Sequence, residues 1–289
     1  MIDIKRNVDQ CNCCMFCVQE CVSGVWREVD GQPRPVSPAL CNACGHCLAV
    51  CPREAICHSL LASGEARRVN RRLLDPTVYA EIVRSRRSIR RFQNKPVDGK
   101  VIEEIFDLAR YSPTASNAQN VAYTVVTDAA VLRQVSVQVF GFGVRLSRWA
   151  KSGPGKVLLG LFKGTTAVRT IHRYLRAMDY YQVQAKAGRD YILHNAPVLI
   201  LIRTPKGTAF GPDNANIAGA NILNYAHALG LGACYIGFLV LMLKRSRRLR
   251  RLLQIPVGQH VQVGLVLGHP AYAHSFIAPR KRPEVRWVE

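Results

Sequence analysis

Cysteine spacing constrains this chain more than any other feature of its sequence. Ten of the eleven cysteines lie before residue 58, and eight of them form two runs with the same spacing, C-x2-C-x2-C-x3-C. The runs are Cys11, Cys14, Cys17 and Cys21, then Cys41, Cys44, Cys47 and Cys51. Two identical runs indicate an internal duplication. Because no apolar leader of the secretory kind precedes them, the clustering favours metal binding over a disulfide framework.

The spacing also indicates which metal group the runs hold. It is the bacterial ferredoxin signature for a [4Fe–4S] cluster, in which three thiolates come from one loop and the fourth reaches the other cluster. Two clusters are therefore expected, one on Cys11, Cys14, Cys17 and Cys51, the other on Cys21, Cys41, Cys44 and Cys47. Zinc is the alternative, but structural zinc sites usually separate two ligand pairs by about a dozen residues or more. Cys13 and Cys57 fall outside the pattern and are expected to be small buried thiols.

The length and the net charge of the chain indicate its number of domains and its expected partners. With 289 residues, about two domains are expected. A net charge of +21 favours phosphate-bearing cofactors, acidic redox proteins or anionic lipid as partners. No apolar run approaches the roughly 18–20 residues of a spanning helix, so a cytoplasmic protein is expected, with peripheral membrane contact at most. No DNA-binding motif accompanies the basic stretches, so nucleic acid is not expected as a partner.

A change of composition after His58 indicates a domain boundary. The basic, polar stretch 63–76 predicts a two-cluster domain over residues 1–65, a linker over 66–76 and a second domain over 77–289. Within the second domain, apolar periodicity predicts helices and strands in turn. The expected helices cover 101–110 and 214–229, and the expected strands cover 122–127, 196–202 and 261–267.

An arginine-rich segment opens the second domain. Five arginines fall within the eight residues from Arg84 to Arg91, broken by serines. Guanidinium groups pair well with phosphate oxygens and serine adds a hydroxyl donor, so the segment predicts a phosphate clamp. A solvated basic face is the alternative. The glycines near residues 141 and 155 do not complete a dinucleotide fingerprint or a P-loop.

Five segments, in order, resemble the nitroreductase family of FMN enzymes: RRSIRRF at 86–92, SPTASNAQ at 112–119, AHALGLGACYIG at 226–237, and the closing GHP and PRKR at 268–270 and 279–282. The resemblance covers residues 77–289. It implies an α+β fold with a mainly antiparallel sheet, an intertwined homodimer, and FMN at the dimer interface. A two-cluster ferredoxin-like domain fused in front is a known arrangement in that family. Asn120 departs from the family, which often has proline there.

The resemblance also implies the flavin contacts. No side chain is indicated as a catalytic acid, so catalytic residues stay unassigned. Cys234 lies near the implied flavin segment; a buried thiol is expected, with a redox role as the alternative. The implied contacts are Arg86, Arg87, Ser88, Arg90, Arg280 and Arg282 for the phosphate, Ser116, Asn117 and Gln119 for the flavin, and backbone near Ile236 and Gly237 for the isoalloxazine.

These features together predict an iron–sulfur flavoprotein oxidoreductase. Electrons would pass through two clusters to FMN, which would reduce a nitroaromatic, quinone or similar conjugated acceptor. Ferredoxin or flavodoxin is expected as donor ahead of NAD(P)H, because acidic proteins are steered to a basic surface. The alternatives are a redox adaptor without its own substrate, and a reductive dehalogenase or ene-type reductase on the same fold.

A basic insertion near 140–178 has two interpretations. The stretch carries eight Lys and Arg and no acid, interleaved with large apolar residues. A lid over the flavin with a solvated outer face is expected. The alternative is a basic amphipathic surface for an anionic membrane.

Overall fold

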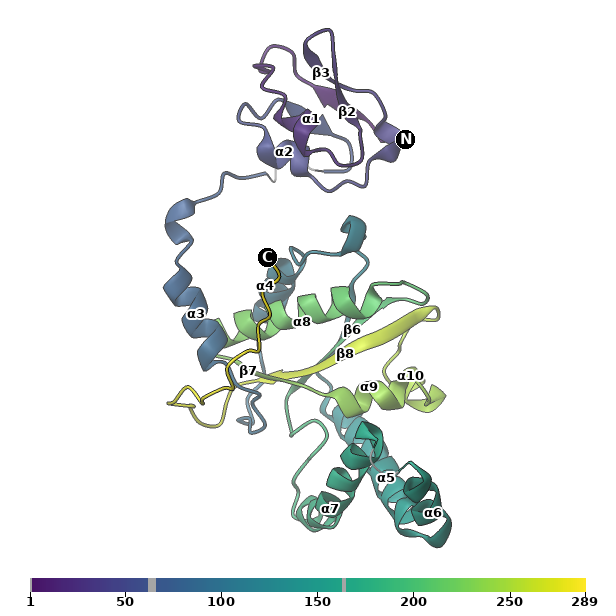
Figure 1. The fold of residues 1–289 in the computed structure, drawn as a ribbon. Helices are drawn as coiled ribbons and strands as arrows, with labels where there is room; N and C mark the ends of the chain where they lie inside the picture. The colour runs from purple at the N-terminus through teal and green to yellow at the C-terminus, as the bar shows by residue number, and fades with distance from the viewer. Residues whose placement is uncertain (1, 62–65, 163–164) are drawn as a thin grey trace. The chain divides into compact units, whose positions relative to one another are not determined.

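The computed structural model describes residues 2–61, 66–162 and 165–289, which form two compact units (Figure 1). The first unit is Met1–Pro76 with Thr114–Gln119, and the second is Thr77–Pro113 with Asn120–Glu289. The expected end of the first domain near residue 65 lies outside the described residues. Within the described residues, no helix is both long and apolar enough to cross a membrane.

The first unit is built from two short two-stranded sheets and two short helices. Strand β1 (Ile4–Arg6) pairs antiparallel with β4 (Ile56–His58), and β2 (Trp26–Val29) pairs antiparallel with β3 (Gln32–Pro35). Helices α1 (Phe16–Glu20) and α2 (His46–Val50) each contain the third cysteine of one run. A small core of Ile4, Val25, Trp26 and Ile56 joins the sheets, and the cysteines pack around it.

The two cysteine runs fold alike. Cys13 and Ala43, at equivalent positions, both have φ 53°. Two residues later, Met15 and Gly45 are also left-handed, with φ 60° and 76°, and each starts a helix. This conformation costs free energy for residues other than glycine, so its recurrence in both halves shows that the duplication extends to the backbone.

Cys57 corrects one expectation, because its side chain is exposed rather than buried. It lies in β4 between Ile56 and His58, which are both buried. Successive side chains of a strand point to opposite faces, so the residue between two inward-facing ones faces solvent.

The second unit is an α+β domain with a four-stranded antiparallel sheet. The strand order is β5 (Ala122–Val126), β6 (Val198–Pro205), β8 (Gln259–Gly268) and β7 (Gly232–Tyr235). From Leu199 to Ile202, β6 is wholly buried, because helices cover both faces of the sheet. Alternate residues of β6 enter two separate cores, as the two-residue period of a strand requires.

Each face of the sheet has its own helices. Helices α4 (Gly99–Ala109) and α8 (Gly211–Ala228) lie on the face that takes Ile200 and Ile202. Helices α9 (Gly237–Leu243), α10 (Arg247–Leu252) and the first half of α5 (Ala129–Lys151) lie on the opposite face. The sheet is thus the middle of three layers.

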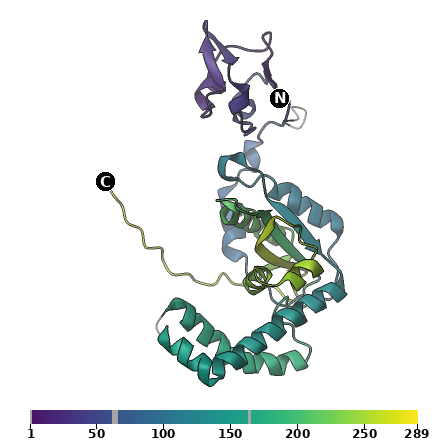
Figure 2. The same cartoon turned by 90° about the vertical axis from the view of Figure 1, so that its right-hand side faces the viewer.

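Three helices form an arm that projects from the sheet, called the helical arm below (Figures 1 and 2). They are α5, α6 (Gly153–Leu161) and α7 (Thr166–Lys186). The basic stretch 140–178 falls within this arm, and its residues 163 and 164 lie outside the described residues. At the other end of the unit, residues 271–289 have no helix or strand and every one of them is exposed.

Candidate functional site

The arginine segment lies along the edge of the sheet, beside β7. Helix α3 (Pro76–Ser85) ends at the second residue of the segment, and the backbone N–H of Ile89 then donates to the carbonyl oxygen of Ala233 at 3.1 Å. Further along, the N–H of Gln93 donates to the carbonyl of His269 at 2.9 Å. These bonds fix the backbone from which Arg86, Arg87, Ser88 and Arg90 project.

A glycine lets the segment come this close. A Cβ added at Gly232 in β7 would lie 2.7 Å from the side chain of Ile89. Any larger residue at position 232 would push the arginine segment off the sheet.

Arg87 is the arginine that most needs a ligand. Its Nη1 donates to the carbonyl oxygens of Arg84 at 2.7 Å and Arg86 at 2.8 Å. Its Nη2 is buried and has no hydrogen-bond partner in the described part of the chain. A buried charged donor without an acceptor is costly, and a phosphate oxygen would satisfy it. The position therefore fits the phosphate of a nucleotide.

His227 in α8 lies beside this segment and stays neutral. The hydroxyl of Ser85 donates to the carbonyl oxygen of Glu81 at 2.7 Å, and the Nε2 of His227 lies 2.7 Å from the same hydroxyl oxygen. Because the hydroxyl proton is already used, Nε2–H of His227 donates to the Ser85 oxygen. Burial lowers the pKa of His227, and the charges of Arg86 and Arg87 lower it further. The imidazole is a packing and hydrogen-bonding partner of Ser85, as expected from its apolar neighbours.

The second expected flavin motif groups with the first unit. Ser116, Asn117 and Gln119 lie in the segment Thr114–Gln119, whose contacts place it there. Asn117 Nδ2 donates to the carbonyl oxygens of Asn42 at 3.0 Å and Ala43 at 2.9 Å. All three expected contacts are left-handed, with φ between 42° and 53°.

The remaining implied contacts divide between fixed and exposed positions. The N–H of Ile236 donates to the carbonyl of Gly264 at 2.7 Å, and Gly237 then begins α9. A Cβ at Gly237 would meet no atom within 4 Å, so space lies beside it for a ligand. Arg280 and Arg282 are exposed in the C-terminal segment, and nothing in the described residues brings them to the other arginines.

The eight motif cysteines line two cavities in the first unit, and none is in a disulfide. Each cavity takes three thiols of one run and the fourth thiol of the other, and Trp26 borders both. The first is lined by Cys11, Cys14, Cys17 and Cys51, and the second by Cys21, Cys41, Cys44 and Cys47. Within the described residues, no three His, Cys, Asp or Glu side chains converge on a point suited to a single metal ion.

Hydrogen bonds from nitrogen to sulfur recur in both halves. The N–H of Cys13 donates to Cys11 Sγ at 3.4 Å, and the N–H of Ala43 donates to Cys41 Sγ at 3.3 Å. Burial pushes the pKa of Cys11 upward, but the bonds from Cys13 and from the Arg6 guanidinium outweigh it and lower the pKa. The chain therefore favours the thiolate, which is the ligand form, at this position.

Burial has the opposite result at Cys17, where it raises the pKa to about 11. A metal that binds Cys17 must displace its proton, so binding there releases a proton.

Cys234 is buried, as expected for a small packed thiol. Its Sγ lies 3.4 Å from the carbonyl oxygen of Tyr235, and its side chain faces the core beneath α9.

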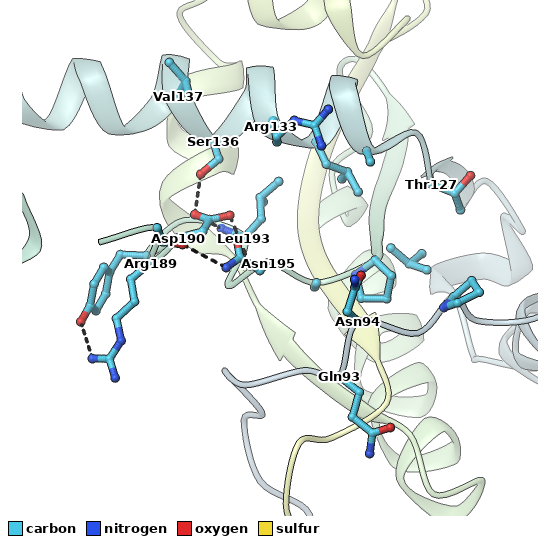
Figure 3. A pocket seen from close by; sticks show the side chains of 18 of the residues that line it. Gln93, Asn94, Thr127, Arg133, Ser136, Val137, Arg189, Asp190, Leu193 and Asn195 are labelled. Carbon is cyan, nitrogen blue, oxygen red and sulfur yellow. Dashed lines mark hydrogen bonds between the residues drawn. The ribbon is translucent and has the colours of Figure 1, made fainter. Parts of the chain in front are cut away.

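A large cavity was not predicted from the sequence (Figure 3). It measures about 650 Å³ and lies between the start of α5 and the loop 188–197. Asp190, the one acid among its lining residues, organises this loop by accepting from the N–H groups of Ile192 at 2.7 Å and Leu193 at 3.0 Å and from the Ser136 hydroxyl. The carboxylate of Asp190 is thus engaged by the loop and by Ser136. Arg133 contributes a positive charge to the wall of the cavity.

A second cavity, of about 430 Å³, is almost wholly apolar. It lies at the root of the helical arm, where α5, α7 and α9 meet, and Phe142, Met178, Phe238 and Leu241 line it. Phe238 directly follows Gly237. The sequence shows that the segment from Phe140 is rich in aromatic and aliphatic residues. That these residues line one cavity follows only from the packing of the three helices.

The structure thus consists of an α+β domain, whose arginine segment fits a phosphate, and a duplicated cysteine-rich unit. A family model described as the Nitroreductase family matches residues 83–269, which is more than half of the chain. The chain belongs to the nitroreductase family. The expected nitroreductase-like α+β fold is thereby confirmed, and the cysteine-rich unit lies outside the matched residues.

Individual relatives agree with the family assignment. A protein named as a candidate NADH dehydrogenase/NAD(P)H nitroreductase from Methanothermobacter thermautotrophicus is 26% identical over 197 residues, or 66% of this chain and 76% of that protein. A nitroreductase with bound FMN from Bacteroides fragilis has a TM-score of 0.51 at 17% identity and covers 73% of this chain and 98% of its own. Iodotyrosine deiodinase bound to FMN and 3-iodo-L-tyrosine has a TM-score of 0.51 at 16% identity. The match covers 73% of this chain and 99% of the deiodinase chain. Both structural likenesses are likenesses of fold.

Proposed function

We propose that this protein is an FMN-dependent oxidoreductase that receives electrons through two [4Fe–4S] clusters and reduces a nitroaromatic, quinone or similar conjugated acceptor. The observation that carries the proposal is the buried Nη2 of Arg87, left without a partner at the start of the region that matches the nitroreductase family. Family relatives whose structures contain FMN support the choice of nucleotide.

The chain's own residues would bind and orient the flavin. Arg87 and Arg86 would hold the phosphate, and the hydrogen bonds of Ile89 and Gln93 would keep them in place against the sheet. Bound FMN supplies the redox chemistry, since it exchanges electrons singly or as a hydride. Five other flavin contacts remain predictions: Ser116, Asn117, Gln119, Arg280 and Arg282. They would form in a homodimer of the family type, in which FMN lies at the interface between the two subunits.

The cysteine-rich unit would hold the clusters. Four free thiols border each cavity, and the N–H···S bonds to Cys11 and Cys41 are of the kind that stabilise cluster thiolates and tune cluster potentials. Iron–sulfur clusters carry single electrons, so this unit would take electrons from a protein donor such as ferredoxin or flavodoxin.

The apolar cavity beside α9 supports a conjugated acceptor. It is lined by Phe142 and Phe238, whose ring centroids lie 6.4 Å apart, with few polar groups. A flat aromatic or quinone ring gains free energy by leaving water for such a site. Reductive dehalogenation is the second candidate, because iodotyrosine deiodinase shares the fold at the same TM-score as the Bacteroides fragilis nitroreductase.

An acceptor screen tests the function. Anaerobically purified protein, reduced by dithionite and desalted, would be mixed with a nitroaromatic, a quinone, a halogenated phenol or an unsaturated ketone. Flavin reoxidation by the first two, with acceptor reduced in proportion to the electrons stored in the protein, is expected, and an Arg87→Ala variant that retains its iron serves as the matched control. Halide release alone would assign the dehalogenase. No turnover with any acceptor would make the protein an electron carrier and contradict the proposal.

A further inference from the structure

The outer end of the helical arm is a surface that the proposed function does not explain. Helix α6 has the sequence GPGKVLLGL, in which Lys156 is the one charged residue. Its inner side is defined by Gly155 and Leu159, which are buried against the end of α5 and the start of α7. A helix with a single buried stripe normally carries polar residues on its other side.

The outer side of α6 is apolar instead. Val157 is 68% exposed and Leu161 is 75% exposed, and both point away from the Gly155–Leu159 stripe by the 3.6-residue period. Phe162, immediately after the helix, is 56% exposed, and Leu158 is 45% exposed. Four large apolar side chains therefore gather on one face, which we call the α6 face.

A tight packing contact fixes this orientation. A Cβ at Gly155 would lie 2.1 Å from the carbonyl oxygen of Trp149, so α6 sits directly on the end of α5. The Ser152 side chain also accepts from the N–H of Gly155 at 3.4 Å and starts the helix. The helix cannot roll to bury Leu161 without breaking this contact.

The helical arm that carries the α6 face is basic. Arg145, Arg148 and Lys156 are exposed and have no acidic partner in the described part of the chain. Lys151 is paired with Asp179 at 2.8 Å. The sequence contains no acid between Asp128 and Asp179, so nothing within the arm offsets the remaining charge.

We infer that the α6 face binds the surface of an anionic lipid bilayer. Exposed Leu, Val and Phe on a short helix, carried by an arm with unpaired exposed cations, are the features by which helices insert into the headgroup region. Each cation near an anionic surface strengthens binding about fivefold. The unpaired positive charge of the arm complements an anionic surface. The arm's outer end lies away from the sheet in both views (Figures 1 and 2), so a membrane can reach it within this unit.

Vesicle binding tests the inference. The full-length protein should sediment with vesicles of phosphatidylcholine mixed with phosphatidylglycerol, and much less with phosphatidylcholine alone. A Leu161→Ser, Phe162→Ser variant should bind about tenfold more weakly or worse, as should Arg145→Gln, Arg148→Gln, Lys156→Gln. Val257→Ser is the matched control, since Val257 is 101% exposed elsewhere on the same unit and should leave binding unchanged.

Hydrogen exchange on the unaltered protein gives an independent measurement. Anionic vesicles should slow amide exchange between residues 145 and 162 and leave the strands unaffected. The inference is overturned if the protein ignores anionic vesicles, or if the Leu161→Ser, Phe162→Ser variant binds them like the parent. It is also overturned if that variant changes the oligomeric state while no vesicle binding occurs, which would assign the α6 face to a second copy.

Discussion

Among the arginines of the 84–91 segment, burial distinguishes Arg87 from its neighbours. Arg84, Arg90 and Arg91 are exposed and solvated, whereas the Nη2 of Arg87 is buried without a partner. Exposed charges contribute little when they bind a surface anion, because water already satisfies them. The free energy of FMN binding should therefore depend on Arg87 far more than on Arg84.

Replacing Arg87 tests this ranking. Arg87→Ala should weaken FMN binding about ten- to a hundredfold, since a hydrogen bond to a charged group contributes roughly 1.5–3 kcal/mol. The FMN affinity of Arg87→Lys should lie between those of the parent and Arg87→Ala, because lysine keeps the positive charge but lacks the two-nitrogen guanidinium group that binds phosphate. Titration of the flavin-free protein by FMN fluorescence measures both. Arg84→Ala is the matched control, and equal losses for Arg84→Ala and Arg87→Ala would show that the phosphate lies elsewhere.

His194 makes the folded chain sensitive to acid. Burial lowers its pKa below the ordinary 6.5, and Arg90 and Arg91 lower it further against the opposing charge of Asp190. The unfolded chain then binds more protons than the folded chain once the pH falls below 6.5. The stability that a neutral His194 permits is thus present above pH 6.5 and is lost as the pH falls toward the lowered pKa.

A His194→Asn variant checks this linkage. Asparagine tolerates the left-handed φ of 60° found at this position and does not titrate. Between neutral pH and about pH 5.5, the Tm of the variant should fall less than that of the parent, because one proton-binding site is removed. Parallel Tm curves for the two proteins would contradict the assignment.

At the scale of elements, β7 and the arginine segment depend on one another. Gly232 in β7 has no room for a side chain, because Ile89 of the segment lies against it. The segment extends the sheet by a parallel bridge between Ser88 and Ala233. We therefore expect phosphate binding to be coupled to sheet packing through the contact of Gly232 with Ile89.

A double-mutant cycle measures that coupling. Gly232→Ala should destabilise the domain by about 1–3 kcal/mol through overpacking and should weaken FMN binding. Combining it with Ile89→Ala should recover part of both losses, since the smaller side chain makes room for the new Cβ. Gly99→Ala is the control, because a Cβ there meets no atom within 4 Å. Strict additivity of the two substitutions in unfolding and FMN titrations would refute the coupling.

For the whole molecule, the clusters and the flavin should be separable. Anaerobic preparations should contain about eight iron and eight sulfide per chain, four of each per cluster. Cys17→Ser should lower the iron content, whereas Cys13→Ser should not, although Cys13 is only four residues away. Bound FMN should be unaffected in both. Iron analysis and visible spectra give the result, and zinc without acid-labile sulfide would end the cluster proposal.

Electron delivery should depend on the basic surface of α10. Reduced ferredoxin should outperform NADH and NADPH, with an advantage that shrinks as ionic strength rises. Replacing Arg247, Arg248 and Arg251 by Gln should slow reduction by ferredoxin more than reduction by dithionite. Arg250 must be kept, because its guanidinium donates to the carbonyl of Gln259 at 2.9 Å and holds the start of β8. Rapid reduction by NADPH with no gain from ferredoxin would contradict this route.

The sequence alone determined the features that depend on local spacing. The cysteine repeat fixes which thiols can share a loop, and the apolar run of β6 and the amphipathic period of α4 predicted their elements to within a few residues. The first turn of α8 was missed, since helix propensity is weak around Gly211 and Pro212. The family resemblance and its α+β fold were also readable from short motifs.

Only the tertiary structure decided which residues of a repeated pattern are buried or hydrogen-bonded and which are exposed. Five arginines in the 84–91 segment look equivalent in sequence, yet among them only Arg87 has a guanidinium nitrogen that is buried without a partner in the described residues. Arg250 looks like its neighbours, yet a carbonyl from β8 engages it. The apolar residues of α6 could equally have formed a core, but Gly155 packs on Trp149 and turns Leu161 outward. Burial and hydrogen bonding are set by residues distant in the chain, so residue spacing cannot reveal them.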